Sequence, residues 1–226
     1  MADPADIRRL HDGWLGRQPA AFQSALIGAA SWRHVDADAT FNHAGDEIGG
    51  IWGIARGQVD GISALGAADS PILDIYIPGL WGGLAPVLGY TRVANCTARL
   101  PTLLALVSQP RLRALLREHP EWWECVAQLA MDFAIRYGSA TGDLLIRSSR
   151  QRVIAVLLRL ANCRHRDPAT LPTIILSHGD LAAAANMSRH LAGETLRVLE
   201  DGRLIDLGYR QVTIRDAAAL RRIVDG

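Results

Sequence analysis

The chain has 226 residues, of which 49% are hydrophobic and 21% charged, a composition typical of a globular protein with one large or two modest domains. No run approaches the ~20 apolar residues of a membrane-spanning helix, and the opening MADPADIRRL lacks the apolar core of a secretion signal, so a cytoplasmic protein without a membrane partner is expected. All 24 basic residues are arginine, and the net charge of +1 gives no general sign of nucleic-acid binding.

Two short helices are expected within residues 4–28. From Ser31 to about Val107 the pattern changes to short apolar or alternating runs separated by Gly, Asp, Asn and Pro. The expected strands are Trp32–Val35, Thr40–Asn42, Ile51–Ile54, Val59–Leu65, Ile72–Ile77, Val93–Cys96 and Leu103–Val107. Turns are expected at Gly45–Asp46, Gly57 and Pro78–Gly79. Many short strands at near-regular spacing predict a small β-barrel or sandwich.

Helical periodicity then returns. One helix is expected over Gln109–His119, a long one over Glu121–Gly142 and another over Ser148–Asn162. The long helix carries an apolar stripe, and a two-fold coiled pairing of two chains would bury it. The stripe comprises Trp122, Val126, Leu129, Phe133 and Tyr137. The alternative is that this stripe packs on the chain's own β-domain.

Two capped helices follow a polar linker over residues 164–172. Ser177 and Ser188 are the expected N-caps, because a serine hydroxyl accepts a hydrogen bond from an unpaired amide of the first turn. A tight break at Asn186–Met187 separates the helices, and Gly202 is expected to end the second in a left-handed conformation. The inner face of the second helix is expected to contain Leu191, Thr195, Val198 and Leu199.

Two short alternating strands, Leu204–Leu207 and Gln211–Ile214, flank Gly208–Tyr209–Arg210 as a hairpin tip. Helix, turn, helix and hairpin in this order predict a winged helix-turn-helix. That motif presents its second helix to the DNA major groove.

This segment resembles the C-terminal domain of the Crp/Fnr family of bacterial transcription regulators. The matching motifs are Asp180–Leu181–Ala182, Ser188–Arg189 and Leu196–Glu200 followed by Leu204–Ile205. Weaker matches occur in the β region at Gly45–Asp46, Trp52, Ile54, Gly57 and Val59, and at Arg92–Ala98. The resemblance covers nearly the whole chain, so an α+β fold is expected.

The resemblance implies three parts. Residues 1–119 would form a cyclic-nucleotide-binding-like effector domain, a β-roll of jelly-roll or cupin-like type. Residues 120–146 would form a dimerisation helix and hinge, in which Gly138 and Gly142 weaken the helix. Residues 147–226 would form the winged helix-turn-helix DNA-binding domain.

In the cyclic-AMP-binding members of the family, an acid binds the ribose and an arginine pairs with the cyclic phosphate. The corresponding segment of this chain, which contains Leu84, Arg92 and Val93 and is called the effector cassette, departs from that pattern. Leu84 stands where the acid is expected. Arg92 matches the phosphate-binding arginine in position, but Val93 follows where a hydroxyl is expected. A ribose hydroxyl left unpaired in such a site costs roughly 1–3 kcal/mol. Cyclic AMP is therefore not expected to be the effector.

Two alternatives stay open around this cassette. Arg92 either binds an anionic effector or is a structural arginine paired with a carboxylate. Trp81 and Trp52, with Tyr76, either line an apolar effector pocket or belong to the core.

The resemblance also indicates which residues would face DNA. Arg189, His190, Gly193 and Glu194 are expected to project from the first turns of the second helix, where Arg189 would bind guanine and Glu194 would accept from cytosine N4. Further candidates, for phosphate contact or for a place near the docking face, are Ser177, Ser188, Arg197 and Arg210. For the serines, helix capping alone is the alternative.

No cofactor or metal site is expected. Cys96, Cys125 and Cys163 are far apart and are expected to be buried and reduced, and His34 and His43 are expected to be surface or core residues. Most of the arginines upstream of the helix-turn-helix are expected on a solvated helix face. They are Arg147, Arg150, Arg152, Arg159, Arg164 and Arg166.

A dimeric, sequence-specific transcription regulator with an unknown small-molecule effector is the leading interpretation. Its expected partners are double-stranded DNA, a second copy of the chain and RNA polymerase, although no segment marks the polymerase contact. The alternative is an effector-independent or architectural DNA-binding protein with a degenerate sensor domain. An enzyme is not expected, because neither a nucleophile–base motif nor a metal set on the strands occurs.

Overall fold

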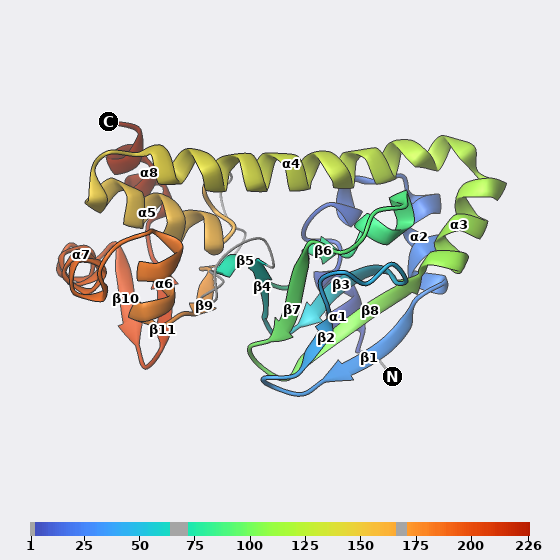
Figure 1. Cartoon of the computed structure of the whole chain (residues 1–226), viewed down its shortest axis with the longest axis horizontal. Coiled ribbons are helices and arrows are strands. Elements are labelled where there is room, and N and C mark those ends of the chain that lie inside the picture. Colours follow the sequence, from blue (N-terminus) through green and yellow to red (C-terminus); the bar gives the residue numbers. More distant parts are fainter. Residues whose placement is uncertain (1–2, 64–71, 166–170) are drawn as a thin grey trace. The chain divides into compact units, whose positions relative to one another are not determined.

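The computed structural model describes residues 3–63, 72–165 and 171–226, and these form two compact units. One lies within Met1–Ser70 and Tyr76–Ala134, and the other within Pro71–Ile75 and Ile135–Gly226. The division falls inside the long helix α4 (Trp123–Leu145) and near the end of the strand β5 (Ile72–Tyr76). Both elements are labelled in Figure 1.

The first unit contains the expected short helices and strands. Its remaining elements are α1 (Pro4–Arg9), η1 (Leu15–Arg17), α2 (Ala20–Gly28), β1 (Ser31–Val35), β2 (Thr40–Asn42), β3 (Gly50–Arg56), β4 (Val59–Ser63), β6 (Trp81–Gly82), η2 (Ala85–Leu88), β7 (Ala94–Ala98), β8 (Thr102–Ser108), α3 (Gln109–Glu118) and η3 (Pro120–Trp122). The two-residue strand β6 was not expected, and the end of the expected strand Val59–Leu65 lies outside the described residues.

The strands of this unit form antiparallel sheets. β1, β8, β3 and β6 lie in that order in one sheet, and β2, β7 and β4 lie side by side in another. Figure 1 shows β1, β8 and β3 running alongside one another. The expectation of an α+β fold with an N-terminal β-domain is confirmed.

Successive side chains of a strand point to opposite sides, so β3 and β8 each present two faces. Both faces are buried. One side packs on the helical elements of the unit, and it comprises Ile51, Ala55, Leu103, Ala105 and Val107. The other side packs toward the second sheet, and it comprises Trp52, Ile54 and Leu104. This central pair of strands therefore divides the core of the unit into two clusters.

Glycines occupy the expected turns. Gly45, Gly57 and Gly79 all have positive φ, of 88°, 97° and 89°. A Cβ at Gly57 would also lie 2.3 Å from Thr102 Oγ1. Glycine is needed there for both its backbone conformation and its lack of a side chain.

The second unit contains the remaining elements. They are α5 (Ser149–Leu160), β9 (Thr173–Ile175), α6 (His178–Ala184), α7 (Arg189–Asp201), β10 (Ile205–Gly208), β11 (Gln211–Ile214) and α8 (Ala217–Asp225). The strands form a sheet of order β10-β11-β9. Neither β9 nor α8 was expected. β9 is too short to show the alternation of apolar and polar residues by which a strand is recognised in a sequence. Helix α8 could have been recognised from its N-cap, Asp216, whose side chain accepts from the Ala219 amide at 2.8 Å.

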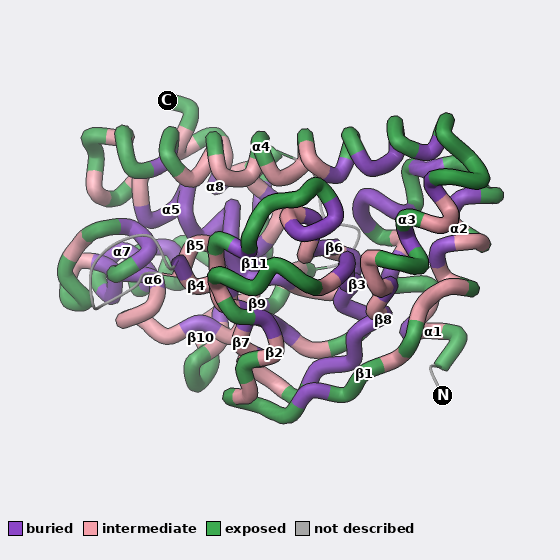
Figure 2. Tube along the Cα trace, turned by 45° about the vertical axis from the view of Figure 1, so that its right-hand side comes forward, coloured by how far each residue is buried: buried purple, intermediate pink, exposed green. Residues whose placement is uncertain are grey.

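A buried ionic network ties this unit together. Arg159 Nε donates to Asp143 at 2.9 Å, and its Nη1 donates to the carbonyl of Leu73 at 2.8 Å. Arg136 pairs with Asp74 at 2.6 Å. The side chains of Arg159 and Asp143 are only 6% and 4% exposed. Figure 2 shows how thoroughly α5 is buried.

The arginines upstream of the helix-turn-helix are thus more structural than expected. Besides Arg159, Arg152 donates to the carbonyls of Ala185 and Ile146, and Arg164 pairs with Asp225 at 3.1 Å. Only Arg147 and Arg150 are exposed, and Arg166 lies outside the described residues. The expectation of a largely solvated face is wrong, because acidic side chains and backbone carbonyls satisfy these guanidinium groups.

Candidate nucleic-acid interface and effector pocket

The helix-turn-helix is built by local capping. The Ser177 hydroxyl accepts from the Asp180 amide at 3.1 Å, and the Asp180 carboxylate accepts from the Ser177 amide at 3.1 Å, which completes a capping box. Asn186 adopts a left-handed φ of 50° in the turn. The Ser188 hydroxyl then accepts from the Leu191 amide at 3.3 Å and starts α7. Both expected caps and the expected break are confirmed.

Helix α7 has a clear inner face. Its buried residues are Ala192, Gly193, Thr195, Leu196 and Leu199. Thr195 and Leu199 agree with expectation, whereas Leu191 is half-buried and Val198 is 48% exposed. Leu196 takes the place that Val198 was expected to have.

Gly193 also belongs to this inner face. A Cβ at Gly193 would lie 3.4 Å from His178 Nδ1, an ordinary van der Waals distance, so this position faces α6. The expectation that Gly193 projects outward is wrong. Arg189, His190, Glu194 and Arg197 are exposed, as expected.

Two of the exposed residues are paired with each other. His190 Nε2 lies 3.3 Å from Glu194 Oε1, one helical turn away. Their side chains are 82% and 54% exposed, so water competes with the pair and its contribution to stability is small.

The wing is the hairpin of β10 and β11. Gly208 pairs with Gln211, which leaves Tyr209 and Arg210 as the tip, and Tyr209 is 94% exposed. Arg210 adopts a left-handed φ of 51°. After α7, Gly202 has a φ of −75° and the left-handed residue is Arg203, at 56°, so the expected left-handed cap at Gly202 is wrong by one residue.

Four exposed arginines lie on the second unit without a carboxylate partner. No ion pair within the described parts of the chain involves Arg189, Arg197, Arg203 or Arg210. By contrast, Arg215 is paired with Asp206, and this carboxylate raises the pKa of Arg215 above its ordinary value. The net charge of the chain is only +1, but these unpaired arginines still offer this unit positive groups that can bind an anionic partner.

The apolar stripe expected at a dimer seam has another role. Trp122, Val126 and Leu129 are buried in the core of the first unit, and Phe133 packs against it. Tyr137 is half-buried. The seam assignment is therefore wrong for the buried residues, and the alternative, packing on the chain's own β-domain, holds for them.

The opposite face of α4 is exposed, and Figure 2 shows exposed residues recurring along that side. Exposed positions recur at alternating steps of three and four residues: Ala127, Met131, Ala134, Gly138, Thr141 and Leu145. This is the spacing of a coiled-coil seam. Met131 is 59% exposed and Leu145 77%, and a Cβ at Gly138 would meet no atom within 4 Å.

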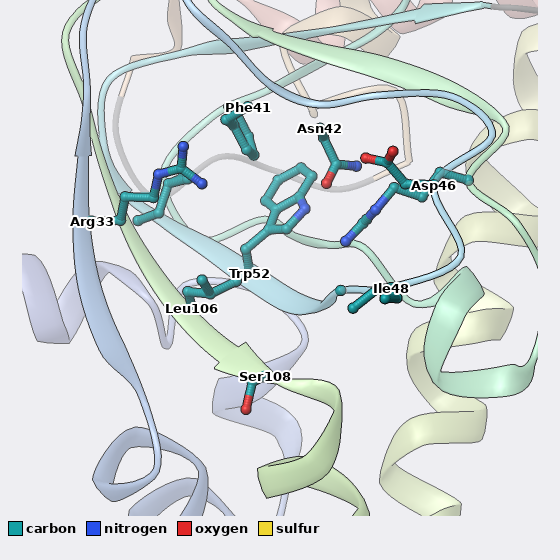
Figure 3. A pocket seen from close by; sticks show the side chains of 11 residues that line it. Arg33, Phe41, Asn42, Asp46, Ile48, Trp52, Leu106 and Ser108 are labelled. Carbon is teal, nitrogen blue, oxygen red and sulfur yellow. The ribbon is translucent and has the colours of Figure 1, made fainter.

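A pocket opens in the first unit between the strands β1, β2, β3 and β8 and the β2–β3 loop. Its volume is about 260 Å³. It is lined by Arg33, Phe41, Asn42, Asp46, Ile48, Gly49, Trp52, Arg92, Leu104, Leu106 and Ser108. Figure 3 shows Trp52 in its centre, with Arg33 on one side and Asn42 and Asp46 on the other.

Arg92 is the buried cation of this pocket. It is 7% exposed, and no carboxylate within the described residues is at ion-pair distance from it. Burial lowers its pKa, although nearby Asp46 opposes the shift. The alternative that Arg92 is a structural arginine paired with a carboxylate is therefore wrong.

Trp81 and Leu84 lie elsewhere. Trp81 packs edge-on against Trp14 at 5.6 Å and donates from Nε1 to the Leu10 carbonyl at 3.2 Å. Leu84 is 5% exposed in the same core cluster. Neither lines the pocket, whereas Arg92 and Trp52 do, together with Arg33 and Phe41. No sequence signal pointed to Phe41, whose place depends on strand pairing.

The three cysteines are buried and form no disulfide, as expected. Cys96 accepts a hydrogen bond from Asn42, at 3.7 Å, beside the pocket. Burial raises the pKa of its thiol to about 12, and the Asn42 hydrogen bond and Arg92 only partly offset this. The described residues contain no group of His, Cys, Asp and Glu that could hold a metal ion, and none of their helices is long and apolar enough to span a membrane.

Comparison with known proteins gives one family and many structural neighbours. Residues 151–223 match the model of the Crp-like helix-turn-helix domain. No curated protein sequence matches the chain. FixK2 from Bradyrhizobium japonicum superposes with a TM-score of 0.72 at 16% identity, covering 85% of this chain and 96% of that one.

Two further neighbours agree. A CRP-family transcriptional regulator from Thermus thermophilus has a TM-score of 0.64 at 22% identity, covering 86% of this chain and 97% of its own. The c-di-GMP-responsive global regulator CLP of Xanthomonas campestris has a TM-score of 0.65 at 18% identity, covering 87% and 99%. The Thermus thermophilus neighbour is a transcriptional regulator and CLP is a global regulator. At such identities they show a shared fold, and with the matched domain they confirm the resemblance to Crp/Fnr regulators.

Proposed function

We propose that this chain, which has the Crp/Fnr regulator fold and a Crp-like helix-turn-helix domain, is a dimeric, sequence-specific DNA-binding regulator whose small-molecule effector is not cyclic AMP. The observation that carries the proposal is the capped α6–α7 pair with four exposed, unpaired arginines on its unit. A guanidinium group can bind either a phosphate or the O6 and N7 atoms of guanine.

Helix α7 is the proposed reading element. Arg189 follows the Ser188 cap and lies on its exposed face, where the first turn of a recognition helix meets base edges. Glu194 accepts from cytosine N4 once its contact with His190 opens. Arg210 at the wing tip, with Arg197, contacts phosphates. Ser177 and Ser188 keep their capping role, since both hydroxyls are occupied by amide donors.

The exposed heptad positions of α4 form the proposed dimer seam. Small residues at Ala127, Ala134 and Gly138 let two helices approach closely, while Met131 and Leu145 supply apolar area. A two-fold dimer of this kind binds two half-sites one DNA turn, or a multiple, apart.

Two observations argue against cyclic AMP. Leu84, in place of the expected acid, is buried in the apolar core, and Val93, in place of the expected hydroxyl, is 50% exposed and apolar. A bound ribose would find no acceptor from either position. The pocket beside Arg92 favours an effector-responsive regulator over a degenerate one, because a purely architectural domain has no need of a buried, unpaired cation.

Selection of binding sites from a random DNA library, with the full-length protein at stated salt, tests the proposal. We expect an enriched motif with two-fold symmetry. Enrichment of a single, unsymmetrical half-site would contradict the dimer. Equal retention of all sequences, with and without the compounds named below, would contradict sequence-specific regulation.

A further inference from the structure

We infer that the pocket around Arg92 and Trp52 binds a small aromatic monocarboxylate, with the carboxylate on Arg92 and the ring against Trp52, Phe41 and Leu106. The inference rests on the proposed function, because it takes the β-domain to be the sensing domain. It names the chemical class of the effector, which the matched domain family does not specify.

The first argument is the unsatisfied charge. Arg92 is 7% exposed, and its Nε has no hydrogen-bond partner within the described residues. Burying a cation without a partner is costly, and proteins normally supply a counter-ion. A carboxylate supplies that counter-ion and can pair with a guanidinium through two parallel hydrogen bonds.

The second argument is the space reserved for that guanidinium. A Cβ at Gly49 would lie 1.9 Å from Arg92 Nη2 and 2.8 Å from its Cζ. The glycine therefore lets the guanidinium lie against the β2–β3 loop, at the edge of the pocket. Any larger residue at position 49 would push Arg92 out of this place.

The third argument is a second unpaired donor. Trp52 is 1% exposed, and its Nε1 has no hydrogen-bond partner within the described residues. In Figure 3 the indole nitrogen is on the side of the ring that faces Asn42. A ligand with an acceptor oxygen near Arg92 would give this donor a partner, and a buried indole N–H usually has one.

The walls and the size of the pocket define the rest of the ligand. Phe41 meets Trp52 edge-to-face with ring centroids 5.4 Å apart, and Leu104 and Leu106 add aliphatic surface. The volume of about 260 Å³ is below the ~300–1,000 Å³ of pockets that hold drug-sized ligands. A single aromatic ring with a short acid group suits such a space better than a nucleotide does.

The charged side chains that line the pocket indicate which ligand charge would neutralise them. Two arginines, Arg33 and Arg92, and one carboxylate, Asp46, line the pocket, so their charges sum to +1. One negative charge on the ligand balances this sum. A monocarboxylate therefore fits better than a doubly charged phosphate monoester.

Isothermal titration calorimetry on the full-length protein tests the inference, with benzoate, phenylacetate and salicylate as the probes. We expect at least one of them to bind with a dissociation constant below about 1 mM. The corresponding neutral amide should bind about ten- to a hundredfold more weakly, because it lacks the charge that Arg92 pairs with. This comparison uses the unaltered protein, so it does not depend on the folding of any variant.

Two variants locate the site. Arg92→Met and Gly49→Ala should each weaken binding about tenfold or more, since one removes the cation and the other displaces it. Arg117→Met is the matched control, because Arg117 is exposed on α3 and does not line the pocket. Absence of binding by all three acids, or equal binding of acid and amide, overturns the inference, as does binding that Arg92→Met leaves unchanged.

The inference and the proposed function can fail separately. If the DNA selection gives a symmetrical motif but no acid binds, the protein is a regulator with another effector. If an acid binds but no DNA sequence is enriched with that acid present, the pocket assignment holds and the regulatory function fails.

Discussion

At the residue scale, the exposed guanidinium groups of α7 and the wing determine how the protein would meet DNA. Arg189→Ala is expected to weaken binding to the selected motif by ~1–3 kcal/mol and to relax the preference at one base pair of each half-site, because a bidentate contact with guanine is lost. A fluorescence-anisotropy titration on the motif and its single-base variants measures both effects.

Arg117→Ala removes the same charge from the other unit and serves as the control. If Arg189→Ala weakens all sequences equally, Arg189 contacts phosphate rather than a base. Arg210→Ala should show that second behaviour and reduce the salt dependence of binding by about one phosphate contact.

Cys96 gives a residue-scale prediction about pH. Burial raises the pKa of its thiol from the ordinary 9.0 to about 12, so the folded state holds the proton more tightly than the unfolded state. The resulting contribution to stability is complete below pH 9 and is lost as the pH rises from about 9 to about 12. We expect wild-type protein to lose stability more steeply than Cys96→Ala in this window, by at most about 1.4 kcal/mol per pH unit.

Urea unfolding at a series of pH values measures this difference. Other groups titrate in the same range, but they are common to both proteins and cancel. Parallel stability curves for the two proteins above pH 9 would show that the thiol keeps its ordinary pKa.

At the element scale, α4 shows where sequence reasoning succeeds and where it stops. Its existence and length could be predicted from periodicity, and the helix caps of the second unit from single serines, because both depend on nearby residues. The face that α4 buries could not. The helix has apolar residues on opposite sides, Val126 and Leu129 on one and Met131 and Leu145 on the other, and only the position of the β-domain decides which side it covers.

The exposed face of α4 makes a prediction about assembly. Met131→Glu is expected to shift the protein from dimer to monomer, because it places two like charges against each other at a two-fold seam. Leu144→Glu is the matched control, since Leu144 is also exposed on α4 but lies off the seam. Sedimentation velocity at several concentrations measures the change, and equal dimer fractions for both variants would rule out this seam.

The ionic network of the second unit gives a prediction about stability. Asp143→Ala is expected to cost ~3–5 kcal/mol, because it leaves Arg159 charged and buried beside a single carbonyl partner, Leu73. The control is Asp132→Ala, which breaks the exposed pair with Arg17 and should cost ~0–1 kcal/mol. Thermal unfolding of the two variants compares the costs. Similar losses in both would mean that the buried pair is no more important than the exposed one.

At the scale of the whole molecule, the order of β-domain, long helix and winged helix could be read from the sequence because the helix-turn-helix motifs are local and specific. The pocket around Arg92 and Trp52 could not be read in the same way. Arg33, Phe41 and Asn42 come from β1 and β2, and Arg92 comes from the segment before β7, so only the pairing of distant strands brings them together. Trp81 and Leu84 were wrongly expected at the effector site for the same reason, since strand pairing places them in the core.

Ligand response is the prediction that belongs to the whole molecule. Cyclic AMP at about 1 mM is expected to leave the affinity for the selected DNA unchanged, because neither Leu84 nor Val93 can accept a hydrogen bond from its ribose. The same titration, repeated with the bound aromatic acid, should shift the affinity, typically by 5–150-fold for a coupled effector. A shift with cyclic AMP of that size would contradict the interpretation of the cassette.

The second unit is discontinuous in sequence, since Pro71–Ile75 group with the C-terminal residues and supply partners to two of its arginines. A fragment starting at residue 147 would carry Arg159 but neither the Asp143 carboxylate nor the Leu73 carbonyl. Such a fragment would be less stable than the same residues in the full chain. The helix-turn-helix part of this protein is therefore no freely transferable module, and a gene fusion with a single breakpoint upstream of it would separate it from segments that complete it.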